Sequence, residues 1–201
     1  RQQVIVHPNT TTDILHKLSF DSNANVRNYV ARRGDITSET LHNLSGDSDK
    51  ETRTLVAIHK KTAPETLHKL SNDSNTAIRW YVARHKNTAP ETLHKLSDDP
   101  DFDIRREIAF NRNVAPETLH KLSDDPDKDI RMLVVRDTKT SPETLHKLSD
   151  DKDFLLEECV KLAERVCSSC DQVFVYDSIS HIFTSDRCLR FKGLSQVGLK
   201  N

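Results

Sequence analysis

The sequence is poor in glycine, methionine and aromatic residues. Only four of its 201 residues are glycine and one is methionine, while Phe, Trp and Tyr together make up 5%. Because glycine is unfavourable inside helices, its scarcity favours a helical chain. No stretch approaches the ~20 consecutive apolar residues of a membrane-spanning helix, and no signal-peptide pattern is present. We therefore predict a cytoplasmic chain without a membrane span.

Motifs of the common enzyme classes are also missing. No P-loop, dinucleotide fingerprint, G-x-S-x-G or H-E-x-x-H pattern occurs. The formal net charge is −1, which gives no overall attraction for nucleic acid or an anionic membrane. Charged residues make up 30% and hydrophobic residues 35%, a balance that suits an elongated array with a thin core. These absences predict a protein that is not an enzyme.

What the sequence does contain is repetition. The stretch PETLHKLSDDPD occurs at Pro90–Asp101 and again, letter for letter, at Pro116–Asp127. A frame of 26 residues extends this match along the chain, and self-similarity at such a period indicates stacked structural repeats. The frame holds a leucine (Leu15, Leu41, Leu67, Leu93, Leu119, Leu145), an aspartate (Asp21, Asp47, Asp73, Asp99, Asp125, Asp151) and an arginine (Arg27, Arg53, Arg79, Arg105, Arg131).

Each repeat is predicted to form two short helices. The first begins with a T-x-x-E capping box such as Thr62/Glu65, with proline in the first turn, where its missing N–H costs nothing. The second is predicted to begin with Asp99 as N-cap and Pro100 as the first helical residue. Each helix carries one apolar stripe, which neither helix can bury alone. Side-by-side stacking of repeats would join these stripes into a continuous core.

The repeat pattern is L-x-x-L-x-x-D-x-(D/N)-x-x-(V/I)-R-x-x-(V/I)-A, followed by a polar turn and T-x-P-E. It resembles the leucine-rich repeat variant family, which is similar in shape to HEAT repeats. The resemblance covers about residues 1–158 and recurs in register at least five times. It implies an all-α, right-handed solenoid in which the first helix of each repeat is often 3₁₀ in character. One type of member carries an N-terminal iron–sulfur cluster, but the cysteines of this chain lie at the other end.

Three segments are predicted along the chain. Residues 1–152 hold about six repeats, of which the first is cut within its second helix, because Arg1 and Val4 fall on the arginine and valine positions. Residues 153–166 are predicted to form a capping helix for the open end of the solenoid. Residues 167–201 are predicted to form a small cysteine-containing module with a short hairpin.

All four cysteines lie in the last quarter of the sequence, which indicates a metal site or disulfides. The spacing Cys167-x-x-Cys170 lets two thiolates reach one ion, and Cys188 with His181 or Cys159 would complete a tetrahedral zinc site. Four cysteines would also suit an iron–sulfur cluster, and disulfides or free thiols are the third alternative. A segment this short has almost no core, so a bound metal would supply its folding energy.

The polar residues that recur in every repeat are predicted to be structural. Arginine bridges carboxylates bidentately and also bonds helix-end carbonyls, so the Asp/Arg ladder is expected to tie neighbouring repeats together. A second row consists of His16, His42, His68, His94, His120 and His146. A repeat spacing near ~10 Å is too wide for two of these side chains to share a metal ion. The histidines are therefore expected to form a half-exposed surface ridge.

Specificity can be encoded where otherwise similar repeats differ. One variable position reads Asn28, Thr54, Trp80, Arg106 and Met132, and the next reads Tyr29, Leu55, Tyr81, Glu107 and Leu133. Tryptophan, tyrosine and arginine are the usual anchors of protein interfaces. We therefore predict that a protein partner binds a patch of Trp80, Tyr81, Arg84 and Arg106. The alternative is that Trp80 packs locally against a neighbouring repeat.

Basic residues collect after the second helix of each repeat: Arg32, Arg33, His59, Lys60, Lys61, Arg84, His85, Lys86, Arg112, Arg136 and Lys139. They would form a stripe able to follow phosphates, or they are simply cations at helix C-termini. The leading hypothesis is a non-enzymatic scaffold for protein–protein interaction with a zinc-bearing cap. The alternatives are a nucleic-acid-binding solenoid and an iron–sulfur or redox-sensing repeat protein.

Overall fold

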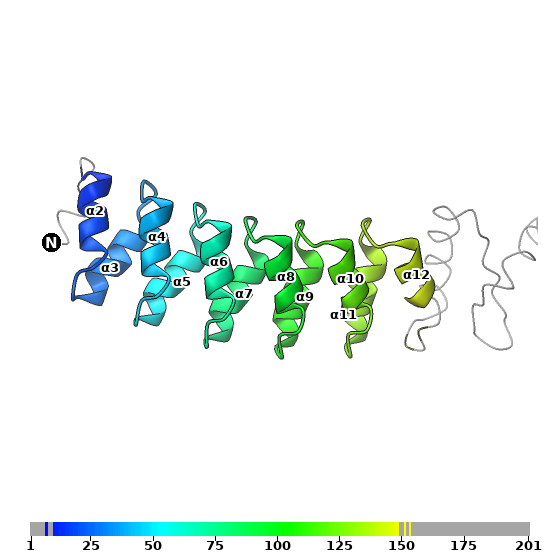
Figure 1. The fold of residues 1–201 in the computed structure, drawn as a ribbon. Coiled ribbons are helices and arrows are strands. Elements are labelled where there is room, and N and C mark those ends of the chain that lie inside the picture. The colour runs from blue at the N-terminus through cyan, green and yellow to red at the C-terminus, as the bar shows by residue number, and fades with distance from the viewer. Residues whose placement is uncertain (1–6, 8–9, 149–150, 152, 154–201) are drawn as a thin grey trace, which may run out of the picture. The chain divides into compact units, whose positions relative to one another are not determined.

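The chain is helical throughout the part that the structure describes. The computed structural model describes residues 7, 10–148, 151 and 153. Within them eleven α-helices follow one another and no strand occurs (Figure 1). The helices are α2 (Thr12–Leu18), α3 (Ala24–Ala31), α4 (Ser38–Leu44), α5 (Lys50–Ile58), α6 (Pro64–Leu70), α7 (Thr76–Arg84), α8 (Pro90–Leu96), α9 (Phe102–Phe110), α10 (Pro116–Leu122), α11 (Lys128–Arg136) and α12 (Pro142–Leu148). None of these helices is long and apolar enough to cross a membrane.

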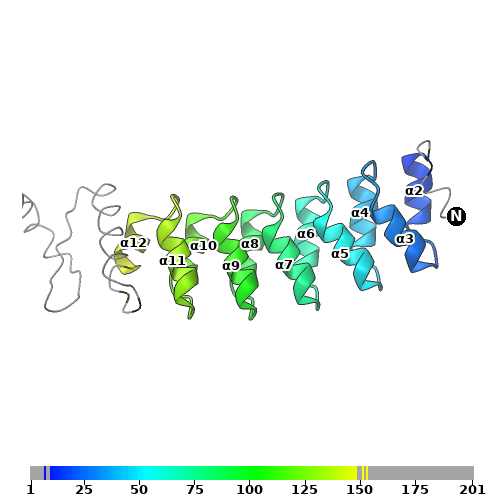
Figure 2. The ribbon, with the colours of Figure 1, turned by 180° about the vertical axis from the view of Figure 1, so that it is seen from behind.

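Two kinds of helix alternate along the chain. First helices of seven residues (α2, α4, α6, α8, α10 and α12) are each followed by a second helix of eight or nine, except for the last. Figures 1 and 2 show these helix pairs from opposite sides. Each pair corresponds to one 26-residue sequence repeat. The prediction of an all-α repeat solenoid is therefore confirmed.

The first helices are α-helices with 3₁₀-type ends. In α6, the N–H of Leu67 donates to the carbonyl of Ala63 at 3.1 Å, an α-helical bond, while the N–H of Thr66 reaches the same carbonyl at 3.0 Å. At the other end, the N–H of Asn72 donates three residues back to Lys69 at 3.3 Å. The 3₁₀ character that the family resemblance implied is thus confined to the helix ends, where the pattern is common.

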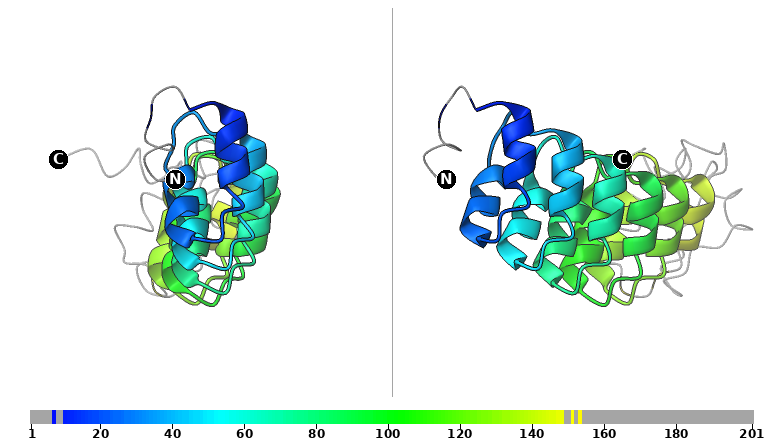
Figure 3. Two further views of the ribbon diagram at one scale, coloured as in Figure 1. Left: turned by 90° about the vertical axis from the view of Figure 1, so that its left-hand side faces the viewer. Right: turned by 60° about the vertical axis from the view of Figure 1, so that its left-hand side comes forward.

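The described residues fall into two compact units, one that ends at Val114 and one that begins at Ala115. In the first unit the second helices α3, α5, α7 and α9 pack in one row, each against the next. The first helices α4, α6 and α8 each contact the second helix before and after them, and Figure 3 shows the two rows from the end and obliquely. In the second unit α11 packs against α10 and α12.

The core of each unit consists of the predicted apolar stripes. Leu67 and Leu70 of α6 are 0% and 2% exposed, and Val82 of α7 is 0% exposed. The equivalent buried positions include Leu41, Leu44, Leu93, Leu96, Leu119, Leu122, Val56, Ile108 and Val134. Full burial of one such side chain stabilises the fold by about 1.5–3 kcal/mol. The first helices supply leucine pairs and the second helices supply β-branched residues and alanine.

The predicted threonine capping boxes are wrong. Helix α6 begins one residue later than the pattern requires, with Ala63 as its N-cap and no side-chain capping bond. Thr62 lies before the cap, fully buried, and its Oγ1 donates to the carbonyl of Val56 at 2.6 Å. Thr88 and Thr140 bond the carbonyls of Val82 and Val134 in the same way. Each threonine therefore gives a second hydrogen bond to a carbonyl in the last turn of a second helix, which also accepts the N–H of the residue that caps the helix.

The predicted start of the second helices is also wrong, by two residues. The N-cap of α9 is Asp101, whose carboxylate accepts from the N–H of Ile104 at 3.3 Å. Asp99 precedes it and accepts both the N–H of Asp101 at 3.0 Å and the guanidinium of Arg79 at 2.7 Å. Pro100 therefore lies in the turn before the helix. The carboxylate expected to cap the helix is held by an arginine of the preceding repeat.

Three predicted features fall outside the described residues. They are the truncated repeat that begins at Arg1, the module at 167–201 and, apart from Asp153, the capping helix at 153–166. These stay predictions from the sequence.

Candidate functional site

The Asp/Arg ladder joins neighbouring repeats, as predicted. Arg53 of α5 binds the carboxylate of Asp73, in the next repeat, through Nε at 2.7 Å and Nη2 at 3.2 Å. Its Nη1 donates to the carbonyl of Asp47, which ends the turn before α5, at 2.8 Å. The first unit repeats this arrangement at Arg27 and Arg79, and Arg131 binds Asp151 and Asp153 in the second. One arginine thus fixes its own turn and the following one.

These joints also set the ionisation of their members. Hydrogen bonding to Asp73 raises the pKa of Arg53 above its ordinary value. Burial alone would raise the pKa of Asp73, but hydrogen bonds from Arg53 and from the N–H of Asn75 outweigh it, so that pKa is lowered. Both groups are therefore held in their charged forms.

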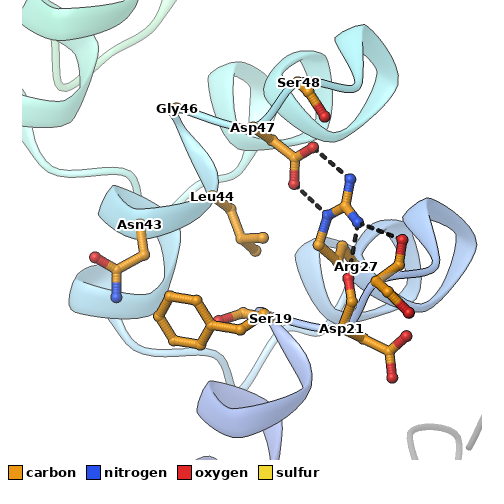
Figure 4. A pocket seen from close by; sticks show the side chains of 10 residues that line it. Ser19, Asp21, Arg27, Asn43, Leu44, Gly46, Asp47 and Ser48 are labelled. Atoms are coloured by element: carbon orange, nitrogen blue, oxygen red, sulfur yellow. Dashed lines mark hydrogen bonds and ion pairs between the residues drawn. The ribbon is translucent and has the colours of Figure 1, made fainter.

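A surface hollow of about 350 Å³ lies beside the first of these joints (Figure 4). Arg27 reaches across it to Asp47, with nitrogen–oxygen distances of 2.5 and 2.7 Å. The ring of Phe20, which is 66% exposed, also lines the hollow and meets His16 edge to face. The Arg27 guanidinium is also bonded to the carbonyls of Asp21 and Ser22, so this cation is engaged in the joint rather than turned to a ligand.

The histidine row links repeats in addition to forming the predicted surface ridge. Nδ1 of His42 lies 3.0 Å from Oγ1 of Thr66, a buried residue of the next first helix. His16, His68 and His120 contact Thr40, Thr92 and Thr144 at 2.9–3.0 Å. The rings therefore have a structural use that their spacing in the sequence did not reveal. Within the described residues, no group of His, Cys, Asp or Glu side chains is arranged to hold a metal ion.

A further inter-repeat row follows the second helices and was not predicted. Nε2 of His59 donates to the carbonyl of Arg33 at 3.0 Å, while its Nδ1 accepts from the N–H of Lys61 at 3.2 Å. His85 makes the same contacts with the carbonyl of His59 and the N–H of Asn87, at 3.1 Å each. Accepting at Nδ1 requires a neutral ring. Burial lowers the pKa of both histidines, in agreement with this geometry.

Asn111 occupies the same repeat position and makes equivalent bonds. Its Nδ2 donates to the carbonyls of Ala83 at 2.6 Å and His85 at 3.3 Å, and its Oδ1 accepts from the N–H of Asn113 at 2.9 Å. At this repeat position an amide and a neutral imidazole therefore make the same link, because each donates to the preceding repeat and accepts an N–H of its own turn. The recurrence of His59, His85 and Asn111 every 26 residues was the available signal, but the two histidines were predicted to belong to a basic stripe.

The structure brings three of the four predicted partner-binding residues together on α7. The rings of Trp80 and Tyr81 meet edge to face, with centroids 5.1 Å apart and an angle of 77°. The guanidinium carbon of Arg84 lies 5.2 Å from the Trp80 ring centroid, within cation–π range. Trp80 and Tyr81 are half-buried and Arg84 is exposed. Trp80 is therefore partly accessible, and its ring packs against Tyr81 and Arg84 of its own helix.

Arg106 belongs to α9 and pairs with a different ring. Its guanidinium carbon lies 5.8 Å from the centroid of Phe110, whose side chain is 57% exposed. Because α9 packs directly against α7, this second arginine–aromatic pair lies on the next helix of the same row. Phe110 was missed as a site residue, although it occupies the same variable position as Arg84.

A groove of about 350 Å³ adjoins Trp80. Its lining combines Ala57, Ile58 and Lys60 from the end of α5 with Trp80, Tyr81, Arg84, His85 and Lys86 from α7 and the turn after it. Ile58 is 48% exposed, although it is a large aliphatic residue. Ile58 and Lys60 were not predicted as site residues, because comparing equivalent positions across repeats does not show which side chains of adjacent repeats meet. We name this feature the Trp80 groove.

The predicted basic stripe is interrupted by acids. Arg32 of the first unit lies 3.3 Å from Glu51, and Arg33 lies 2.6 Å from Asp35. The cations near Trp80, by contrast, are Lys60, Arg84 and Lys86, and no carboxylate is among the residues that line the groove. Positive charge therefore gathers at the groove, whereas at Arg32 and Arg33 it is offset by neighbouring carboxylates.

The predicted zinc ligands Cys159, Cys167, Cys170, Cys188 and His181 lie outside the described residues. The zinc, iron–sulfur and disulfide alternatives therefore stay predictions.

In sequence comparisons, no protein-family model and no curated protein matches the chain. Among solved structures, the chain is similar to one described as "a leucine-rich repeat variant with a novel repetitive protein structural motif" (25% identity, 82% of this chain and 79% of that chain, TM-score 0.38). It is also similar to an engineered protein (18% identity, 78% and 96%, TM-score 0.46). A third is YibA of Escherichia coli (13% identity, 100% and 83%, TM-score 0.48). The first description names the family that the repeat pattern resembles.

Proposed function

We propose that this chain is a non-enzymatic scaffold that binds another protein at the Trp80 groove. The observation that carries the proposal is the placement of large exposed or half-exposed side chains on adjacent second helices. Ile58, Trp80, Tyr81 and Phe110 lie on α5, α7 and α9, which pack in one row. Aromatic side chains with neighbouring arginine are the residues most often found at the energetic centre of protein interfaces.

The first helices support the same assignment by contrast. Helices α6, α8, α10 and α12 share the sequence PETLHKL. Their histidines and leucines are engaged in stacking, as shown by the His68–Thr92 contact and the burial of Leu67. A surface that repeats without change offers a partner several equivalent positions and therefore no single register. The second helices differ from repeat to repeat, so they offer a partner one defined position.

The proposal is tested by affinity capture with the full chain as bait, followed by calorimetry with the captured protein. We expect Trp80→Ala to weaken binding about thirtyfold or more, the effect of losing an interface anchor. Glu65→Ala, an exposed change on the first helix α6, is the matched control and is expected to bind as the unaltered chain does. Thermal melts establish that both variants fold. Equal affinity of Trp80→Ala and the unaltered chain would exclude the groove.

Nucleic acid is a second candidate, favoured by the three cations at the groove. Two contacts weigh against it. Arg84 covers one face of the Trp80 ring, which base stacking would need. Arg32 is engaged by Glu51 farther along the row. Phosphate binding would fall steeply as salt rises, so the absence of a gel shift at low salt rejects this candidate.

We also propose that the C-terminal cysteines bind zinc, on the strength of the Cys167-x-x-Cys170 spacing and the nearby Cys188 and His181. Metal analysis with a visible absorption spectrum separates the alternatives. One colourless equivalent of zinc supports the proposal, and brown colour indicates an iron–sulfur cluster. A metal-free chain leaves disulfides or free thiols.

A further inference from the structure

We infer that the Trp80 groove binds an acidic segment of its partner that inserts one large apolar side chain. This inference rests on the proposed function and specifies the chemistry of the partner. It follows from two properties of the groove, its apolar floor and its cationic rim.

The floor is apolar and only partly covered. Ile58 contributes aliphatic surface from α5 above the fully buried Ala57, and Trp80 and Tyr81 contribute ring surface from α7. Ile58 alone is 48% exposed, whereas the β-branched core residue Val56 of the same helix is fully buried. At about 350 Å³, the hollow lies at the small end of the range for bound ligands, about 300–1,000 Å³. It therefore suits a single bulky side chain presented by a larger molecule.

The rim is cationic on both sides. Lys60 follows α5, Arg84 is the last residue of α7, Lys86 lies in the turn after it, and no carboxylate is among the residues that line the groove. His85 also lines the groove but adds no charge, because its Nδ1 accepts the N–H of Asn87 and the ring is therefore neutral. Three cations without a counter-charge complement a partner that carries Asp or Glu beside its apolar anchor.

The internal contacts of Trp80 favour a polypeptide over a nucleic acid. Tyr81 meets Trp80 edge to face, and Arg84 lies over the Trp80 ring. The part of the ring that these contacts leave accessible lines the groove together with Ile58, and such a surface suits an inserted aliphatic or aromatic side chain. The chain as a whole has a formal net charge of −1, so its attraction for acidic groups is local to the groove.

Selection from a displayed library of random short peptides tests the inference. The full chain is the target, and the Trp80→Ala chain removes peptides that bind elsewhere. We expect the remaining pool to be enriched in Asp and Glu together with at least one Phe, Trp, Tyr, Leu or Ile. Trp80 is the only tryptophan in the sequence, so its fluorescence reports directly whether a tryptophan-free peptide from the pool occupies the groove.

A charge-reversed variant provides the matched control. Lys60→Glu combined with Lys86→Glu leaves the apolar floor unchanged, and is expected to weaken acidic peptides about tenfold or more. Arg32→Glu, a charge reversal at an exposed residue that does not line the groove, is expected to leave peptide affinity unchanged. Thermal melts of both variants confirm that they fold.

The possible failures are distinguishable. A Trp80-dependent pool without acidic residues, or one indifferent to the charge reversal, overturns the inference and leaves the proposed function standing. A library that yields no Trp80-dependent peptide, together with a captured partner that ignores Trp80→Ala, overturns both. Trp80-dependent binding of a single-stranded oligonucleotide at physiological salt, with no peptide selected, assigns the groove to nucleic acid instead.

Discussion

The first and second helices of the repeats divide the work of the molecule differently. Four of the first helices share seven residues, and their side chains reach the neighbouring repeat through contacts such as His68–Thr92. The second helices share a buried stripe and the arginine of the ladder, yet their outward residues change from Thr54 to Trp80 to Arg106. Repetition thus encodes stacking, and departures from it leave positions free for recognition.

The largest predicted effect breaks the stacking contacts. Arg53→Ala would leave the carboxylate of Asp73 buried with fewer partners and release the carbonyl of Asp47. We expect a loss of about 3 kcal/mol in the free energy of unfolding, measured by urea denaturation. Arg32→Ala removes only an exposed pair with Glu51 and is expected to change stability by about 0.5 kcal/mol or less. Equal effects of the two substitutions would show that the ladder does not hold the repeats together.

A smaller effect is expected where first and second helices meet. Thr62→Val keeps the shape of the buried side chain and removes its hydrogen bond to Val56. Because the Val56 carbonyl still accepts the N–H of His59 at 3.2 Å, the expected loss is about 1 kcal/mol. Thr76→Val, at an exposed position of α7, is the control for the change of residue type and should alter stability by about 0.5 kcal/mol or less. A neutral Thr62→Val variant would count against a structural role for the threonine.

The inter-repeat row that contains His59 and His85 is predicted to weaken in mild acid. His59 and His85 have lowered pKa values in the folded chain but protonate near ~6.5 once unfolded. Below that pH the unfolded state binds more protons, so the free energy of unfolding falls as the pH falls toward the folded-state pKa values. The His59→Asn, His85→Asn double variant reproduces the residue found at Asn111 and should lose less stability between pH 7 and pH 5. Denaturation curves with identical pH dependence would refute this.

The repeat frame made much of the fold predictable, because the same leucines and arginines recur in every copy. The predictions of the helix starts were wrong where a side chain bonds a group outside the helix that it was expected to cap. Thr62 matches a local capping pattern yet bonds Val56, and Asp99 is held by Arg79 of another repeat. Only part of the site was predicted, because its other residues come from a different repeat. Trp80 and Arg84 lie one turn apart on α7 and were found together, whereas Ile58 reaches the groove from the neighbouring repeat.

A moderate effect on stability is expected at the groove itself. Trp80→Thr places the residue found at Thr54 on α7 and removes the contacts of the half-buried Trp80 ring with Arg84 and Tyr81, which are worth about 0.5–1 and about 0.5–1.5 kcal/mol. The free energy of unfolding should therefore fall by less than it does for Arg53→Ala, while the affinity for the partner falls about thirtyfold or more. A loss as large as that of Arg53→Ala would instead assign Trp80 to the stacking contacts.

The division between stacking and recognition is tested most directly by calorimetry on two block variants with the captured partner. One carries Ile58→Ala, Trp80→Ala and Tyr81→Ala on the second helices, and the other carries Glu39→Ala, Glu65→Ala and Glu91→Ala on exposed sites of the first. We predict that the first variant unfolds cooperatively but no longer binds, and that the second binds as the unaltered chain does. Retained binding in the first variant, or binding lost only in the second, would contradict the account.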